Sequence, residues 1–249
     1  MMDALNSYVL MLLIGLPFGW GVLLVFLPKH RVQHIRLTSA VVAFVGLCLT
    51  IYVFLNYDNK LGGYQFIAEY KWVESLGISF SMGVDGISVP MVLLTGIVMF
   101  TGVLISWNIE VRTKDFFVLL FLLVAGVYGV FVSIDLFFFF FFYELAVMPM
   151  YLLIGVWGSS SDFGAFLRPK EYGAMKLMLY LVAGSILVWV ALLAVFVEGG
   201  TGTFSLTDLE TVQFSENFQR LFFPFFMIGF GILAGLWPFH TWSPDGHVA

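Results

Sequence analysis

The sequence predicts an all-α integral membrane protein. Of its 249 residues, 61% are hydrophobic and 11% are charged, whereas a soluble domain is about 45–50% apolar and about 25% charged. The apolar residues form continuous runs of about 20, as spanning helices require, and not the short alternating segments of a barrel. The few basic residues are scattered, so a lipid bilayer, and not nucleic acid, is the expected partner.

About seven runs are long enough to span the membrane. They cover 8–27, 37–55, 87–107, 116–134, 136–157, 172–197 and 221–239. Each is expected to be a helix, because backbone groups in hydrocarbon must satisfy their hydrogen bonds within the protein. The seventh is expected to be broken, because Pro238 interrupts the helical hydrogen-bond ladder.

Two polar connections lie on the same side of the expected bundle. Residues 56–86 contain YQFIAEYKWV and ISFSMGVDG, which indicate short extended pieces or a hairpin lying on the membrane face. Residues 198–220 are expected to hold a short interfacial helix. Asp85 and Asp135 precede apolar runs, where a carboxylate can cap a helix and complement its dipole.

The distribution of basic residues predicts the orientation. Loops after the odd-numbered helices are richer in Lys and Arg, and such loops face the cytoplasm. The richer side carries Lys29, Arg31, Arg36, Arg112, Lys114, Arg168 and Lys170, and the other carries Lys60, Lys71 and Arg220. We therefore expect a multi-pass protein of a bacterial inner membrane with an external N-terminus.

The chain is expected to comprise two parts. Residues 1–115 would hold helices one to three with the external loop 56–86, and residues 116–249 would hold helices four to seven. The sequence stops at PDGHVA directly after an apolar helix, which predicts a piece of a longer protein.

Glu144 is the first candidate functional residue. It follows six phenylalanines and Tyr143, about eight residues or roughly 12 Å from the external end of its helix. An acidic residue at the centre of a spanning helix costs about 2.5–3.5 kcal/mol, so it usually faces a bundle interior or water. We expect Glu144 to load and release a proton; the alternative is a structural carboxyl hydrogen-bonded to another helix.

Lys176 is the second candidate. It lies roughly 6–8 Å from the cytoplasmic end of helix six, shallow enough for its ammonium to reach the surface. On the helix, Lys176 shares one face with Tyr180, Ala183 and Leu187, and Gly173 and Gly184 lie beside that face. Small residues favour a close helix interface over a lipid-facing surface. A buried Lys176 could exchange a proton with a hydrated neighbour.

The seventh run supplies the third candidate, His240, which follows the broken segment. It is interpreted either as a proton relay or as a buried histidine with satisfied hydrogen bonds. The spacing of His240, Asp245 and His247 fits no zinc pattern, so no metal is expected. The letters GFGILA resemble a dinucleotide fingerprint, but they follow no strand and open no βαβ unit.

Four stretches together resemble one family. They are VDGISVPMVLLTGIV (84–98), DLFFFFFFYELAVMPMYLLIGVWG (135–158), AMKLMLYLVAGS (174–185) and WPFHTWSPDGHVA (237–249). They resemble the antiporter-like membrane subunits of respiratory complex I, the proton-translocating NADH–quinone oxidoreductase, and chain M in particular. The FYEL-x-x-x-PMYLLIG and PFHTW-x-PD-x-H blocks are the specific part of the match.

The resemblance implies a function. Such subunits have about fourteen spanning helices of about 20 residues each, so this chain looks like the N-terminal half, with 116–249 opening the translocating module. The family pumps protons while other subunits of the enzyme pass electrons from NADH to quinone. No redox cofactor is expected in this chain, and its expected partners are adjacent antiporter-like subunits.

The resemblance assigns roles and shows one departure. Glu144 matches the family's essential glutamate, and His240 and His247 match its two histidines. The family places a lysine seven residues before the first histidine, where this chain has Leu233. Because that lysine forms a switching ion pair with the glutamate, Lys176 is expected to substitute for it.

Two other functions remain open. The related D-type subunit of multisubunit Na⁺/H⁺ antiporters shares the fold and the glutamate, although the PMYLLIGVWG and PFHTW wording favours chain M. A chain without the helix-seven lysine could also be a scaffold that fills the membrane arm without translocating protons.

Overall fold

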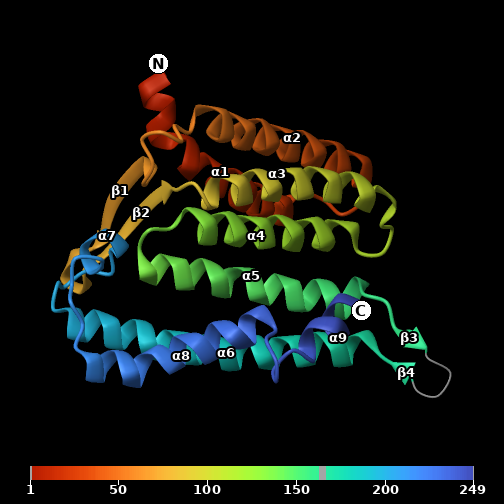
Figure 1. The fold of residues 1–249 in the computed structure, drawn as a ribbon. Coiled ribbons are helices and arrows are strands. Elements are labelled where there is room, and N and C mark those ends of the chain that lie inside the picture. Colours follow the sequence, from red (N-terminus) through yellow and green to blue (C-terminus); the bar gives the residue numbers. More distant parts are fainter. Residues whose placement is uncertain (1, 163–166, 249) are drawn as a thin grey trace. The chain divides into compact units, whose positions relative to one another are not determined.

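The computed structural model of the protein describes residues 2–162 and 167–248. Within these residues, seven helices are long and apolar enough to cross a membrane. They are α1 (Met2–Phe26), α2 (Val32–Asn56), α3 (Ser88–Ile105), α4 (Thr113–Val132), α5 (Leu136–Trp157), α6 (Lys170–Gly199) and α8 (Glu216–Ala234). The predicted all-α multi-pass membrane fold is confirmed (Figure 1).

The chain forms two compact units. The first comprises residues 1–74 and 78–146, and the second comprises residues 75–77 and 147–249. The change from one unit to the other falls inside α5, after Ala146. The division at residue 115, expected from the order of helices along the sequence, stays a prediction.

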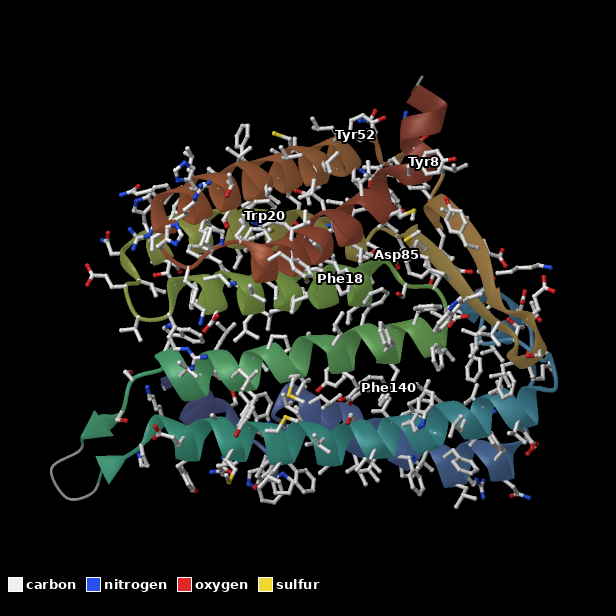
Figure 2. All side chains as sticks on the ribbon, turned by 180° about the vertical axis from the view of Figure 1, so that it is seen from behind. Tyr8, Phe18, Trp20, Tyr52, Asp85 and Phe140 are labelled. Atoms are coloured by element: carbon white, nitrogen blue, oxygen red, sulfur yellow. The ribbon has the colours of Figure 1, made fainter. Side chains whose placement is uncertain are left out.

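Helices α1 to α4 pack against one another in the first unit: α1 contacts α2 and α4, and α3 contacts α2 and α4. Hydrogen bonds between polar side chains connect α1 to α2: Trp20 donates to Ser39 at 3.1 Å, and Tyr52 donates to Asn6 at 2.8 Å. Trp20 and Tyr52 are labelled in Figure 2. Gly96 of α3 lies directly against Thr50 of α2. A small residue at this contact allows the two helices to approach closely.

The basic loops of the first unit are bound to each other. The Lys114 ammonium at the start of α4 donates to the carbonyls of Val25 and Leu27, at 2.6 and 2.9 Å. The Arg36 guanidinium donates to the carbonyl of Ile109 at 3.0 Å, just after a 3₁₀ turn at Ser106–Asn108. These contacts gather the basic residues of the α1–α2 and α3–α4 loops at one end of the unit.

The predicted hairpin in 56–86 is confirmed. Strands β1 (Gln65–Val73) and β2 (Ile78–Val84) pair antiparallel across a turn at Glu74–Leu76. The hairpin is bound to the α4–α5 turn, because the Ile134 N–H donates to the carbonyl of Ser81 at 3.1 Å.

The second unit is built on α6. This helix packs against α8 and against a short helix, α9 (Trp242–Val248). Two short strands, β3 (Ser161–Asp162) and β4 (Leu167–Arg168), pair before α6 begins. The short helix predicted in 198–220 is α7 (Leu206–Leu209).

Glycines set the close approach of α6 to α8. A Cβ on Gly184 would lie 3.0 Å from the carbonyl oxygen of Gly229, and a Cβ on Gly229 would lie 2.9 Å from that of Gly184. These two glycines let the helices approach closely, because a side chain on either one would meet the backbone of the other helix.

The predicted break in the seventh spanning helix is confirmed, but it begins earlier than Pro238. Helix α8 ends at Ala234, and Gly235 takes a left-handed conformation with φ 70°. The Leu236 N–H donates to the carbonyl of Gly231 at 2.8 Å, which closes the helix end. Glycine adopts this conformation without a Cβ penalty, so it stops the helix before the proline is reached.

Candidate functional site

Glu144 lies half-buried in the part of α5 that belongs to the first unit. Around it, α5 packs closely on α4: the ring of Phe142 contacts Gly129, and a Cβ on Gly126 would lie 2.9 Å from the backbone nitrogen of Ala146. Glu144 is two residues from each of these contacts, which is about 200° around a helix of 3.6 residues per turn. Its carboxylate therefore projects from the side of α5 opposite α4.

The phenylalanine run has a structural role in the first unit. Phe138 packs against Phe80 and Trp72 of the hairpin, with ring centroids 4.8 and 5.3 Å apart. Phe142, one turn further along α5, lies 6.1 Å from Phe80. Aromatic pairs at such separations add to the stability gained from area burial, so the run holds the start of α5 against the hairpin.

Asp135 caps α5 as expected. Its Oδ1 accepts the N–H groups of Phe137 and Phe138 at 2.9 and 3.1 Å, and its Oδ2 accepts that of Ser79 in β2 at 3.2 Å. The residue is fully buried. Burial raises the pKa of the Asp135 carboxyl, and the three backbone hydrogen bonds only partly oppose that shift.

Asp85 caps α3 in a similar way. It accepts the N–H groups of Ser88 and Ile87 at 2.7 and 3.1 Å, while the Ser88 hydroxyl accepts the N–H of Asp85 at 2.8 Å. Partial burial raises the pKa of Asp85, but its hydrogen bonds with Ser88 and Ile87 together bring that pKa below its usual value.

Lys176 forms an ion pair inside the second unit. Its ammonium donates to Asp245 Oδ2 of α9 at 2.7 Å, and the side chains are 18% and 6% exposed. The sequence left open whether the Lys176 ammonium reaches the surface or is buried, and it suggested Asp245 only as a possible metal ligand. A charged group in a spanning helix needs a counter-charge, and Asp245 is the acid in the broken segment. That rule is the signal that could have identified it.

A second polar contact lies beside the ion pair. The Thr241 hydroxyl donates to Tyr180 Oη at 3.4 Å. Lys176 and Tyr180 are one turn apart on α6, and their partners occur in reverse order, so the two segments run antiparallel. Gly246 allows the close contact, because a Cβ there would lie 2.8 Å from Leu177.

The two histidines that follow the seventh run, His240 and His247, are exposed. His240 lies between α8 and α9, where its carbonyl accepts the Ser243 N–H at 3.1 Å. The His247 Nδ1 is 2.6 Å from the carbonyl oxygen of Ser243. His240 is therefore not the buried histidine that the alternative interpretation described. Among the described residues, no group of three or more His, Cys, Asp or Glu side chains could hold a metal ion.

Of the three predicted site residues, Lys176 and His240 belong to the second unit and Glu144 belongs to the first. Lys176 is paired with Asp245. Leu233, at the position where the resembling family has a lysine, makes an apolar contact with α6, because its Cδ2 would lie 2.9 Å from a Cβ on Gly184.

Comparison with known proteins identifies relatives of this chain. The model of the family "NADH:quinone oxidoreductase/Mrp antiporter, TM" matches residues 133–249. This part of the chain, just under half of its length, matches that membrane domain. Its curated relatives include NAD(P)H-quinone oxidoreductase chain 4 1 of Synechococcus elongatus, which is 35% identical over 222 residues, covering 89% of this chain and 40% of the relative. The corresponding Nostoc protein is 32% identical over 248 residues, covering 99% and 45%.

Solved structures share the fold. A chain of respiratory complex I from Thermus thermophilus with bound NADH matches with a TM-score of 0.81 and 26% identity, over 96% of this chain and 46% of that one. A chain of the Mrp complex from Dietzia matches with a TM-score of 0.73 and 19% identity, over 96% and 25%. The resemblance to complex I membrane subunits is confirmed, and this chain spans less than half the length of these relatives.

Proposed function

We propose that this chain is part of a membrane subunit that translocates protons for an NADH–quinone oxidoreductase. Electron transfer from NADH to quinone would occur in other subunits, and this chain would hold no redox cofactor. The family and the names of the curated relatives support the oxidoreductase. The partners would be adjacent antiporter-like subunits of the membrane arm.

The observation that carries this proposal is that ionisable groups lie inside spans of the matched membrane domain. Glu144 lies in α5 and Lys176 lies in α6, both away from the helix termini. Charged groups in spanning helices are costly and mark ion pathways by default. These two residues are therefore the proposed proton carriers, with Lys176 in place of the lysine that Leu233 replaces.

His240 is the proposed site of exchange with water. Its side chain is exposed in the segment between α8 and α9, and an imidazole changes its charge near physiological pH. Loose backbone beside an ionisable side chain is also typical of ion pathways in transporters. By the distribution of basic loop residues, the N-terminus would be external. The proposed membrane is a bacterial inner membrane.

The second candidate function is a D-type subunit of a multisubunit Na⁺/H⁺ antiporter. The fold match to the Mrp complex supports it. The higher identity to the complex I chain and the names of the curated relatives favour the oxidoreductase. Proton uptake that depends on sodium and not on NADH would favour the antiporter.

The test uses the assembled enzyme in inverted membrane vesicles. NADH oxidation and proton uptake are measured together, and Glu144→Gln and Lys176→Gln should each lower proton uptake per NADH about tenfold or more, equivalent to at least about 1.4 kcal/mol. Glu198→Gln is the control, because this glutamate is exposed at the end of α6. Normal pumping in both variants would refute the proposal and favour the scaffold function.

A further inference from the structure

The Lys176–Asp245 pair fixes the position of a short helix. Helix α9 has seven residues, too few for an isolated helix to be stable in water. It is held by Asp245 on Lys176, by Thr241 on Tyr180, and by the indole N–H of Trp242, which donates to the carbonyl of Ile232 at 2.8 Å. Of these three contacts, the ion pair is the one whose strength depends on protonation.

The pair is a costly way to hold two helices together. Removing two charges from water carries a penalty that their attraction offsets only in favourable geometry, and apolar residues of similar size often serve equally well. Here Asp245 is 6% exposed and Lys176 is 18% exposed. A purely structural contact would not require either charge, whereas proton transfer at Lys176 would require both.

We propose that Asp245 is a positioning residue for proton transfer at Lys176, an inference that rests on the proposed function above. The carboxylate holds the ammonium in a fixed place on α6. When the contact opens, the ammonium gives its proton to a water molecule and becomes a neutral amine. Reprotonation of the amine closes the pair again.

The geometry agrees with a contact that can open locally. The pair joins α6 to a helix that follows the break at Gly235, so α9 can shift without unwinding α8. Trp242 is 6% exposed and bonded to the end of α8, which leaves it as a pivot. Tyr180 and Thr241 supply hydroxyl groups one turn from the pair, where a released proton could be passed on.

The test is a set of variants in the assembled enzyme, with proton uptake per NADH oxidised normalised to the amount of enzyme. Asp245→Asn should lower that ratio about tenfold or more, and Asp245→Glu, which restores the charge, should recover at least half of it. The double variant Lys176→Gln/Asp245→Asn should pump no less than Lys176→Gln alone, because the two residues act as one unit. Asp208→Asn is the matched control, since this acid is exposed in α7.

Each outcome bears on a different claim. If Glu144→Gln and Lys176→Gln fail to pump while Asp245→Asn pumps normally, the role of Asp245 is overturned and the proposed function stands. If Asp245→Asn only reduces the amount of enzyme and leaves the ratio unchanged, its role is structural. Should Asp245→Asn not assemble, the double variant removes both buried charges, and normal pumping by it would overturn the inference. If Glu144→Gln and Lys176→Gln both pump normally, the proposed function itself fails.

Discussion

Replacing Asp135 by alanine should loosen the junction between the hairpin and α5. The carboxylate is fully buried and accepts three backbone N–H groups, from Ser79, Phe137 and Phe138. Alanine removes both acceptor oxygens and so breaks all three hydrogen bonds. The side-chain hydrogen bonds of residue 135 would then no longer join β2 to the first turn of α5.

The size of the effect follows from the hydrogen bonds that are lost. Each net hydrogen bond contributes about 1 kcal/mol, and a buried donor left without a partner costs about 1–3 kcal/mol. Three lost bonds, less the relief of no longer burying a charge, predict a loss of about 2–4 kcal/mol for Asp135→Ala. Asp135→Asn should lose only about 1 kcal/mol, because its single carbonyl oxygen still accepts the α5 donors but faces Ser79 with an amide.

The pH dependence has a definite sign. Burial raises the pKa of Asp135 above its usual value of 3.8, so the folded protein binds this proton more tightly than the unfolded chain. The resulting contribution of Asp135 to the free energy of unfolding is fully present below pH 3.8. It is lost as the pH rises through the raised pKa of the folded state. The side chain of the Asp135→Asn variant cannot titrate. The unfolding free energy of this variant should therefore lack this part of its dependence on pH.

Thermal unfolding in detergent, followed between acid and neutral pH, tests both statements. Asp58→Ala is the control, because Asp58 is exposed and caps a single N–H, that of Lys60; it should cost less than about 1 kcal/mol. The reasoning is wrong if Asp135→Ala unfolds at the same temperature as the wild type, or if the Asn variant keeps the full pH slope.

Four further substitutions, one of them a control, test the packing of the helices. Gly184→Ala should cost about 1–3 kcal/mol because its Cβ meets a backbone oxygen, whereas Gly102→Ala, with open space around it, should be neutral or stabilise by up to about 1 kcal/mol; unfolding midpoints that move together would contradict this. Lys114→Ala should lose about 1–3 kcal/mol by freeing the carbonyl of Leu27, seen as faster proteolysis of the α1–α2 loop; an unchanged cleavage rate would count against it. Phe138→Ala should cost about 3–5 kcal/mol by emptying the aromatic cluster, and an unfolding temperature equal to the wild type would rule that out.

Several elements could be predicted because their causes are local. The spans follow from continuous apolar runs, and the hairpin follows from its alternating extended segments between them. The break in the seventh helix was expected from Pro238, but Gly235 ends the helix first, because a left-handed glycine closes the last turn on its own. Asp135 was expected at a helix start, while its bond to Ser79 in β2 was not.

The sequence by itself determined that the chain spans a bilayer and does so as helices. Both follow from neighbouring residues alone, because apolar runs and the hydrogen bonds within each helix are local. It also identified Glu144 and Lys176 as ionisable groups in apolar surroundings. Only the tertiary structure decided that Lys176 is paired with Asp245, 69 positions along the chain, and that Glu144 projects away from α4. Those facts depend on which helix faces meet, and the periodicity of one segment carries no information about the register of another.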